Sequence, residues 1–201
     1  GLDAWVVQRD VQDPAEYAEL WARDAGARQG VAGFEGMYAA WLADFAARDV
    51  EGIGFGIVTV QRPATEREPW IELDEVPGPV APGVGHAVDS GLRARTAIAE
   101  GGTAYLLDTA WRVAADVTEE RHALPGASDP AVILARQGGG LRRVVRLDTV
   151  TAGLLGVCDG TLTARAALAA IAQLLEADEA ATVGSALPIL RALVADGLLV
   201  P

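Results

Sequence analysis

Apolar and polar positions alternate over three stretches of the first eighty residues, as they do in β-strands. These stretches are residues 4–11, 53–62 and 70–76, and the last two predict the arms of a hairpin. After the first stretch, Asp13-Pro14-Ala15-Glu16 has the pattern of a capping box with proline at the first helical position. A second helix is predicted from Phe34 to Phe45, where apolar and aromatic residues recur at helical spacing. We expect its aromatic side chains to belong to the core.

Prolines and glycines at 77–83 mark the clearest boundary in the chain. Beyond it the pattern predicts a short helix over 84–99, followed by a β-rich segment. Its strands are expected at about 110–121, 131–137 and 141–147, and the glycines at 138–140 predict a hairpin between the last two.

From Asp148 onward, alanine and leucine at helical spacing predict three helices. Gly160 is expected to end the first and Thr163 to cap the second. Pro188 means that the third either begins near Ser185 or is kinked, and residues 198–200 add a small strand. Three helices and a terminal strand in about fifty residues predict a winged-helix-like helical module. The chain is therefore expected to combine α/β and α+β structure in three parts, 1–77, 78–147 and 148–201.

Composition and charge narrow the classes of partner. Hydrophobic residues make up 51% of the chain, and the net charge is −12 with arginine as the only strongly basic residue. Such a chain has no general attraction for nucleic acid phosphates or anionic lipid, so we expect neither DNA nor a membrane as partner. One cysteine excludes a disulfide framework, no apolar stretch reaches the ~20 residues of a membrane span, and no signal peptide is visible. We expect a cytoplasmic protein.

The glycines of Gly52-x-Gly54-x-Gly56 have the spacing found in nucleotide-binding loops, but the predicted elements on either side are in the wrong order. A nucleotide site needs a strand before the glycines and a helix after them, and here a helix precedes and a strand follows. We interpret the glycines as the start of a strand that approaches a neighbouring backbone closely.

Other reactive residue types lack the neighbours that chemistry requires. The two histidines are far apart and outside any metal-binding motif, the serines lack a nucleophile elbow, and the single cysteine is expected on the apolar face of a helix. The acidic residues at 66–75 are interpreted as a solvated face. We predict no catalytic, cofactor-binding or metal-binding residue among His86, His122, Ser90, Ser185 and Cys158.

One stretch of the chain is basic, although the chain as a whole is acidic. Residues 131–147 contain four arginines and no acid, and guanidinium groups can bind a phosphate or carboxylate on a partner or acceptor. They can equally pair with acids of the neighbouring domain, which is the interpretation we favour. The winged-helix-like part offers two arginines against six acids, which suits a protein-facing or structural role better than DNA. The candidate contact residues are Arg136, Arg142, Arg143 and Arg146.

Several of these runs resemble a known enzyme family. Residues 4–11, 13–25, 38–45 and 50–60 are similar to the later part of an actinobacterial class I S-adenosylmethionine-dependent methyltransferase, among the relatives of the release-factor glutamine methyltransferases and the small-domain RNA methyltransferases. Asp129-Pro130, Leu141-Arg142-Arg143 and Ala195-Asp196-Gly197-Leu198 resemble the C-terminal extension of the same group.

The resemblance implies that residues 1–77 are the end of a Rossmann-like sheet. The family binds its cofactor at a glycine-rich loop and its target nitrogen at an Asn-Pro-Pro-Tyr-type motif, and this chain has no asparagine, so no functional residue is carried over. S-adenosylmethionine would be bound by the parent protein and not by this chain alone, which we expect to be inactive. The implied partners are the rest of the methyltransferase domain and a protein or RNA acceptor, with strand pairing between two copies also open. The alternative is a complete, non-enzymatic protein-interaction module.

Overall fold

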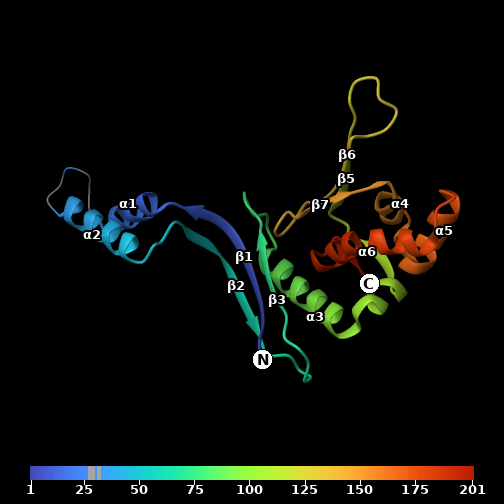
Figure 1. Cartoon of the computed structure of the whole chain (residues 1–201), viewed down its shortest axis with the longest axis horizontal. Helices are drawn as coiled ribbons and strands as arrows, with labels where there is room; N and C mark the ends of the chain where they lie inside the picture. The colour runs from blue at the N-terminus through green and yellow to red at the C-terminus, as the bar shows by residue number, and fades with distance from the viewer. Residues whose placement is uncertain (27–29, 31–32) are drawn as a thin grey trace. The chain divides into compact units, whose positions relative to one another are not determined.

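The computed structural model describes residues 1–26, 30 and 33–201, which form two compact units. Unit 1 contains residues 1–62 and 69–78, and unit 2 contains residues 63–68 and 79–201. Within the described residues the fold is α+β, with six helices and three small sheets (Figure 1). Each unit is described by itself below.

The sheet of unit 1 has the strand order β2-β1-β3. Strand β1 is antiparallel to β2 and parallel to β3. The predicted hairpin between 53–62 and 70–76 is therefore wrong, because β1 lies between these two strands. Alternation identified the strands but carries no information on which strand each one pairs with. The strands are β1 (Asp3–Gln12), β2 (Ile53–Gln61) and β3 (Ile71–Glu75).

Two helices, α1 (Pro14–Asp24) and α2 (Phe34–Ala47), follow one another between β1 and β2, at the end of the ribbon that these strands form (Figure 1). The predicted capping box is confirmed, since the Asp13 side chain accepts N–H groups of the first turn and Glu16 accepts the N–H of Asp13. Tyr17 holds the helices and β2 together, with its ring 5.7–5.8 Å from the rings of Trp41, Phe45 and Phe55. The interpretation of these aromatics as packing residues is confirmed.

Unit 2 begins with the long helix α3 (Val84–Asp108), which continues beyond the predicted end at residue 99. It is kinked at Gly102, whose φ of 58° and ψ of −148° lie outside the helical region. The glycine thus redirects the helix instead of ending it, and the second segment brings Leu106 and Leu107 into the core.

The predicted strand 110–121 is two strands in different sheets. They are β4 (Ala110–Val113) and β5 (Val117–His122), separated by a turn in which the N–H of Val117 donates to the carbonyl of Ala114. Strand β5 pairs with β6 (Val132–Gln137), and β6 pairs with β7 (Val144–Leu147), both antiparallel. The predicted hairpin across 138–140 is confirmed, with its second strand starting at residue 144.

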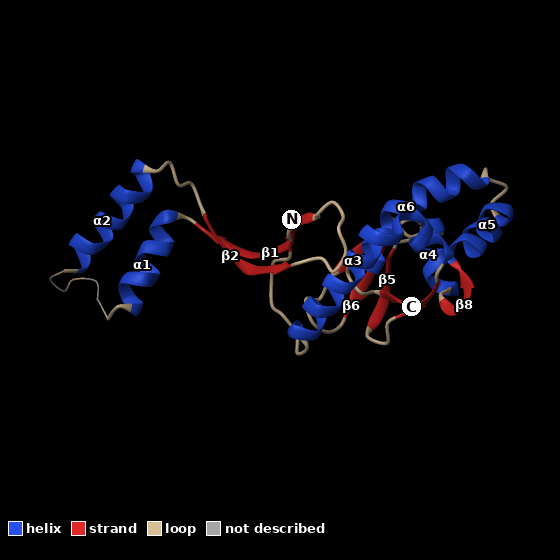
Figure 2. Cartoon of the chain, turned by 90° about the horizontal axis from the view of Figure 1, so that it is seen from below, coloured by secondary structure: helices blue, strands red, loops and turns tan. Residues whose placement is uncertain are grey.

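The last fifty residues contribute three helices that gather at one end of unit 2, with β8 beside them (Figure 2). Strand β4 lies between the two short strands of this segment, giving the order β8-β4-β9. One core unites α3, the strands and these helices around Trp111, Leu154, Leu168 and Leu190. The elements are α4 (Thr149–Val157), β8 (Asp159–Thr163), α5 (Ala164–Leu174), α6 (Glu179–Ala195) and β9 (Leu199–Val200).

Helix ends in this segment confirm one prediction, correct a second and exclude one of two alternatives for the third. Thr163 caps α5 as predicted. Helix α4 ends at Val157, so Gly160, with φ of 88°, does not end it but bends the chain inside β8. Of the two alternatives for the third helix, the start near Ser185 is excluded, because α6 begins at Glu179 with Asp178 as its cap and runs through Pro188.

Candidate functional site

One face of the unit 1 sheet is apolar and exposed. The pairing register places Val58 and Leu73 on either side of Val6, and Val60 and Ile71 on either side of Ala4. The four outer side chains are 69%, 75%, 53% and 68% exposed in that order. A contiguous group of exposed aliphatic side chains on a sheet marks an interaction surface. We call this group, Val58, Val60, Ile71 and Leu73, the apolar sheet face.

The opposite face of the same sheet is buried and mixed, with Trp5 and Val7 beside polar groups that have partners. The indole N–H of Trp5 donates to Asp74 at 2.8 Å. Asp3 is fully buried and accepts both the amide of Gln61 at 3.0 Å and the backbone N–H of Trp70 at 3.2 Å. Burying a carboxylate requires such partners, so the two faces of one sheet are built for different environments.

The glycines at 52–56 serve the sheet, as the sequence predicted. A Cβ atom at Gly56 would lie 2.2 Å from the carbonyl oxygen of Val7, a distance that no side chain tolerates. Gly56 stands opposite Gln8, where the register of β1 shifts by one residue. This glycine allows β2 to approach the irregular part of β1.

In unit 2, a cavity of about 290 Å³ lies at the start of α3. Its wall includes Gly83 and His86 from the first turn of the helix, Asp116, and Gln137 from β6. Asp116 accepts the backbone N–H of Gly139 at 2.8 Å and thereby fixes the glycine turn at 138–140. The cavity is thus formed by a helix start and a tight turn.

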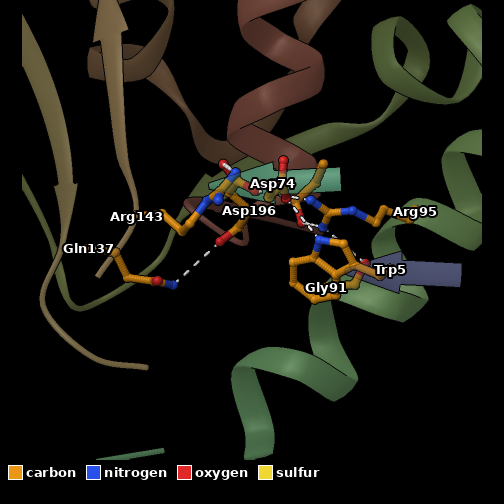
Figure 3. Close-up of polar contacts among 8 residues, drawn as sticks. Trp5, Asp74, Gly91, Arg95, Gln137, Arg143 and Asp196 are labelled. Carbon is orange, nitrogen blue, oxygen red and sulfur yellow. Dashed lines mark hydrogen bonds and ion pairs between the residues drawn. The ribbon is translucent and has the colours of Figure 1, made fainter. Parts of the chain in front are cut away.

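A buried ionic cluster, shown in Figure 3, contributes Gln137 and Asp196 to the wall of this cavity. Asp196 lies between two guanidinium groups, with Arg143 at 2.7 Å and Arg95 at 3.3 Å. Arg95 is buried and also donates to the carbonyl of Ala195 at 2.5 Å. Gln137 donates to the carbonyl of Asp196 at 3.4 Å. The cluster ties α3, β6, the following turn and the end of α6 together.

The position of Asp196 follows from how α6 ends. Gly197, with φ of 73°, ends the helix in the left-handed conformation, and the N–H of Leu198 donates to the carbonyl of Leu193 at 2.8 Å. This is a Schellman motif, and it directs the carboxylate of Asp196, at the last helical turn, toward the two arginines.

A second, mainly apolar cavity of about 350 Å³ adjoins the first. The two share Ser90, Gly197 and Val200 in their walls. Tyr105 and Trp111 line the apolar part, with their rings edge to face at 5.4 Å, and burial raises the pKa of Tyr105. The pair forms a groove along α3 whose lining is mainly apolar, more strongly so further along the helix than at its start.

The four arginines predicted as a contact group separate into two kinds. Arg136 makes a two-point pair with Glu120 at 2.6 and 3.2 Å, which holds the pKa of that carboxyl below its ordinary value, and Arg143 belongs to the buried cluster. Arg142 and Arg146 are exposed and make no ion pair with any described residue. Arg142 lies in the turn before β7 and Arg146 on the outer face of the sheet, opposite Leu134.

The remaining reactive residues occupy structural positions. Cys158 caps the end of α4 instead of lying on its face, and burial together with the nearby Asp159 raises the pKa of its thiol to about 11. The hydroxyl of Ser185 donates to the carbonyl of Thr182, and His122 lies 3.5 Å from Glu120. Ser90 and His86 come within 3.4 Å, one helical turn apart on α3.

The interpretation of the acids at 66–75 as a solvated face is wrong for β3, where Ile71 and Leu73 are exposed and Glu72 and Asp74 are half-buried. Alternation shows that a strand has two faces but not which of them is covered. Asp74 accepts from Trp5 and Glu75 from Gln8. Within the part of the chain that the structure describes, no group of histidine, cysteine and acidic side chains is placed to hold a metal ion.

Sequence reasoning missed Arg95, Asp196 and Gln137 as a connected group. The available signal was Asp196-Gly197 directly after an apolar helical run, because glycine commonly ends helices and an acid that is buried there needs a partner. Arg95 lies on α3, about a hundred residues away in the chain, so no local sequence pattern predicts its contact with Asp196.

Searches against protein families, curated proteins and solved structures found no match to this chain. None of the described helices has the length and apolar character needed to cross a bilayer.

Proposed function

We propose that this chain is the later, non-catalytic part of an S-adenosylmethionine-dependent methyltransferase. In this proposal unit 1 supplies the last strands of a Rossmann-like sheet, and unit 2 has a structural or acceptor-recognition role. The cofactor is bound by the rest of the methyltransferase domain, and this chain alone has no methyl-transfer activity. The sequence runs at 4–60 and 195–198 that resemble such enzymes led to the proposal.

The observation that carries the proposal is the apolar sheet face. Full burial of each such side chain contributes roughly 1.5–3 kcal/mol, so four adjacent ones favour a covering layer strongly. In a Rossmann-like sheet both faces are covered by helices. Among the described strands, β2 also has one edge that pairs with no other strand, which gives a preceding part of a sheet a place to join.

The order of elements after residue 148 supports a winged-helix-like module. Helix, strand, helix, helix and strand follow one another as α4, β8, α5, α6 and β9. The third strand of the sheet is β4, which comes from before the first helix and lies in the middle. Because acids outnumber arginines in this segment, we assign it to the protein itself or to a protein acceptor instead of DNA.

Calorimetry with S-adenosylmethionine and its demethylated product tests where the cofactor site lies. We expect no heat of binding with this chain alone. Micromolar binding would show that the chain holds a cofactor site of its own and would overturn the assignment. The reading frame upstream gives an independent check, since a glycine-rich strand–loop–helix followed by Asn-Pro-Pro supports the enzyme.

The covering of the apolar sheet face is tested by a double variant, Val58→Thr with Leu73→Thr. Both side chains are exposed, so the stability of the chain should stay within about 0.5 kcal/mol. Binding of a hydrophobic dye and any self-association should fall clearly, whereas Val144→Thr, an exposed valine of unit 2, should change neither. If the original chain, the double variant and the Val144→Thr control bind the dye equally, the apolar sheet face is not the surface that a partner covers.

A second candidate function is a protein-interaction module that binds an acidic partner. The exposed guanidiniums of Arg142 and Arg146, without ion pairs to described residues, favour it. The double charge reversal Arg142→Glu with Arg146→Glu should then weaken capture of an acidic partner at least tenfold. Arg48→Glu, which changes an exposed arginine already paired with Asp44, is the matched control. Equal capture by both variants would eliminate this candidate.

A further inference from the structure

Strand β2 forms one edge of the unit 1 sheet, and it lacks the features that usually keep edge strands from pairing (Figure 1). It has nine residues, Ile53–Gln61, and none of them is charged or a proline. Proteins commonly prevent edge-to-edge association with short edges, charges and prolines. Apart from the two-residue β9, every other described edge strand carries at least one charged side chain. Among the described edges, β2 is therefore the one best suited to pair with a further strand.

The opposite edge of the same sheet is protected. Strand β3 has five residues, three of them acidic, and Pro69 and Pro77 flank it. Two copies of such a strand side by side would bring like charges together, which is unfavourable. In a chain of net charge −12, the uncharged β2 is a strand along which two copies can meet without that local repulsion. The charge pattern thus favours a second copy of the chain as the partner of β2.

The hydrogen bonds of β1 show which main-chain groups of β2 point to the free edge. The N–H of Ala4 donates to the carbonyl of the residue before β3. Because successive residues of a strand point their main-chain groups to opposite sides, Trp5 faces β2, where it pairs with Thr59. The N–H and C=O groups of Val58 and Val60 therefore point away from β1, toward the free edge. These two residues are also 69% and 53% exposed.

The sequence of β2 is self-complementary about Thr59. A twofold axis through this residue sets Val58 of one copy opposite Val60 of the other, and the reverse. Each such pair exchanges two main-chain hydrogen bonds, and β-branched side chains opposite each other stabilise a sheet. Because side chains directly opposite each other lie on one side of a sheet, the apolar sheet faces of the two copies become one continuous surface.

We propose that two copies of this chain associate by antiparallel pairing of β2 with β2, about a twofold axis at Thr59. The two three-stranded sheets thereby form one six-stranded sheet. The association involves no chemical step and does not depend on the proposed methyltransferase. A preceding part of a sheet, joining at the same edge, would compete with the second copy.

Sedimentation analysis of the whole chain at about 5 to 200 µM tests the association. We expect dimers with a dissociation constant in the micromolar range, because the pairing covers a small area compared with that of a permanent dimer. A chain that stays monomeric over this whole range would overturn the proposal. S-adenosylmethionine plays no part in the measurement, so its outcome is separate from that of the methyltransferase proposal.

Two double variants with the same charge change separate the strand edge from the sheet face. Val58→Lys with Val60→Lys places ammonium groups opposite each other across the axis and should weaken the dimer at least tenfold. Ile71→Lys with Leu73→Lys makes the same change on the same face, but on β3, the strand furthest from the pairing edge, and should stay within threefold. All four side chains are exposed, and circular dichroism checks that both variants fold.

The other outcomes of this pair contradict the proposal. Equal weakening by both variants would mean that the sheets pack face to face. Unchanged association in both would place the contact on another surface of the chain.

Disulfide formation tests the register. At the axis, the two copies of Thr59 form a pair without mutual hydrogen bonds, with Cα atoms about 4.5 Å apart, a distance that a disulfide spans. Thr59→Cys should therefore give a covalent dimer under mild oxidation. Ile57→Cys is the control, because Ile57 is also half-buried on the same face, and its two copies lie four residues apart in this register, about 13 Å. We expect at least tenfold less dimer from the control on a non-reducing gel, and equal yields would overturn the proposed pairing.

Discussion

The two units differ in where they leave apolar residues exposed. Unit 2 encloses them in one continuous core that joins α3, the strands and the last three helices, and places a buried ionic cluster beside it. Unit 1 buries Asp3, Trp5 and Val7 on one face of its sheet and leaves the apolar sheet face to solvent. Since apolar area removed from water is the main driving force of folding, unit 2 carries its own stability. Unit 1 has an apolar surface still available for binding.

Trp111→Ala should have the largest effect, because it removes the centre of the unit 2 core. The indole is 1% exposed, packs edge to face on Tyr105 and donates to the carbonyl of Leu106 at 2.8 Å. We expect a loss of about 3–5 kcal/mol in the free energy of unfolding, measured by chemical denaturation. Trp21→Ala in unit 1 is the control, since that ring is 44% exposed and should cost about 1 kcal/mol or less. Equal losses would contradict the contrast between the units.

Asp196→Ala should be nearly as costly, because it leaves Arg95 buried without this carboxylate. Breaking a buried pair from one side destabilises by about 3–5 kcal/mol. The control is Asp44→Ala, whose partner Arg48 is on the surface of unit 1 and whose loss should cost less than about 1 kcal/mol. The melting temperatures of both variants test this prediction. A melting temperature of the Asp196 variant equal to that of the original chain would show that the cluster adds no stability.

Contacts within a few residues of one another were predictable, and long-range ones were not. The caps at Asp13 and Thr163 follow from residues at most three positions apart, so their sequence signals are complete. Whether β3 pairs with β1 or β2 depends on residues about seventy positions distant, and alternation is the same in either case. The helix predicted over 84–99 stops before the glycines at 101 and 102, whereas α3 continues beyond a kink at Gly102 and buries Leu106 and Leu107.

The residues that line the groove along α3 could not be predicted for the same reason, because they meet only through long-range contacts. His86, Gln137 and Trp111 come from three separate elements, and none stands in a motif. Only the glycine turn at 138–140 was visible in the sequence, where it predicted a hairpin. Its contact with Asp116 depends on the turn before β5, which was predicted as continuous strand.

Gly56→Ala should have a moderate effect confined to unit 1. The new methyl group would lie 2.2 Å from the carbonyl of Val7, so one strand must move, and we expect a loss of about 1–3 kcal/mol. Gly36→Ala, at an open position of α2, should be neutral or stabilising by up to about 1 kcal/mol. Hydrogen exchange of the β1 and β2 amides would locate the change, and unaltered exchange there would contradict a close approach of the strands.

The smallest expected effect is on the alkylation rate of the Cys158 thiol, without any change in stability. This rate reports whether the core of unit 2 is closed to solvent. Burial raises the pKa of this thiol to about 11, and only the thiolate reacts with alkylating agents. Since the raised pKa keeps the thiol protonated, the thiolate fraction at pH 8 is about one hundredth of that of a thiol with the ordinary value of 9.0, and it rises about tenfold per pH unit up to pH 11. Alkylation of the folded chain, followed by mass spectrometry, should be slower than that of the denatured chain by about a hundredfold or more at pH 8. A folded chain that reacts at the denatured rate would mean that unit 2 is as open around Cys158 as unit 1 is along its apolar sheet face.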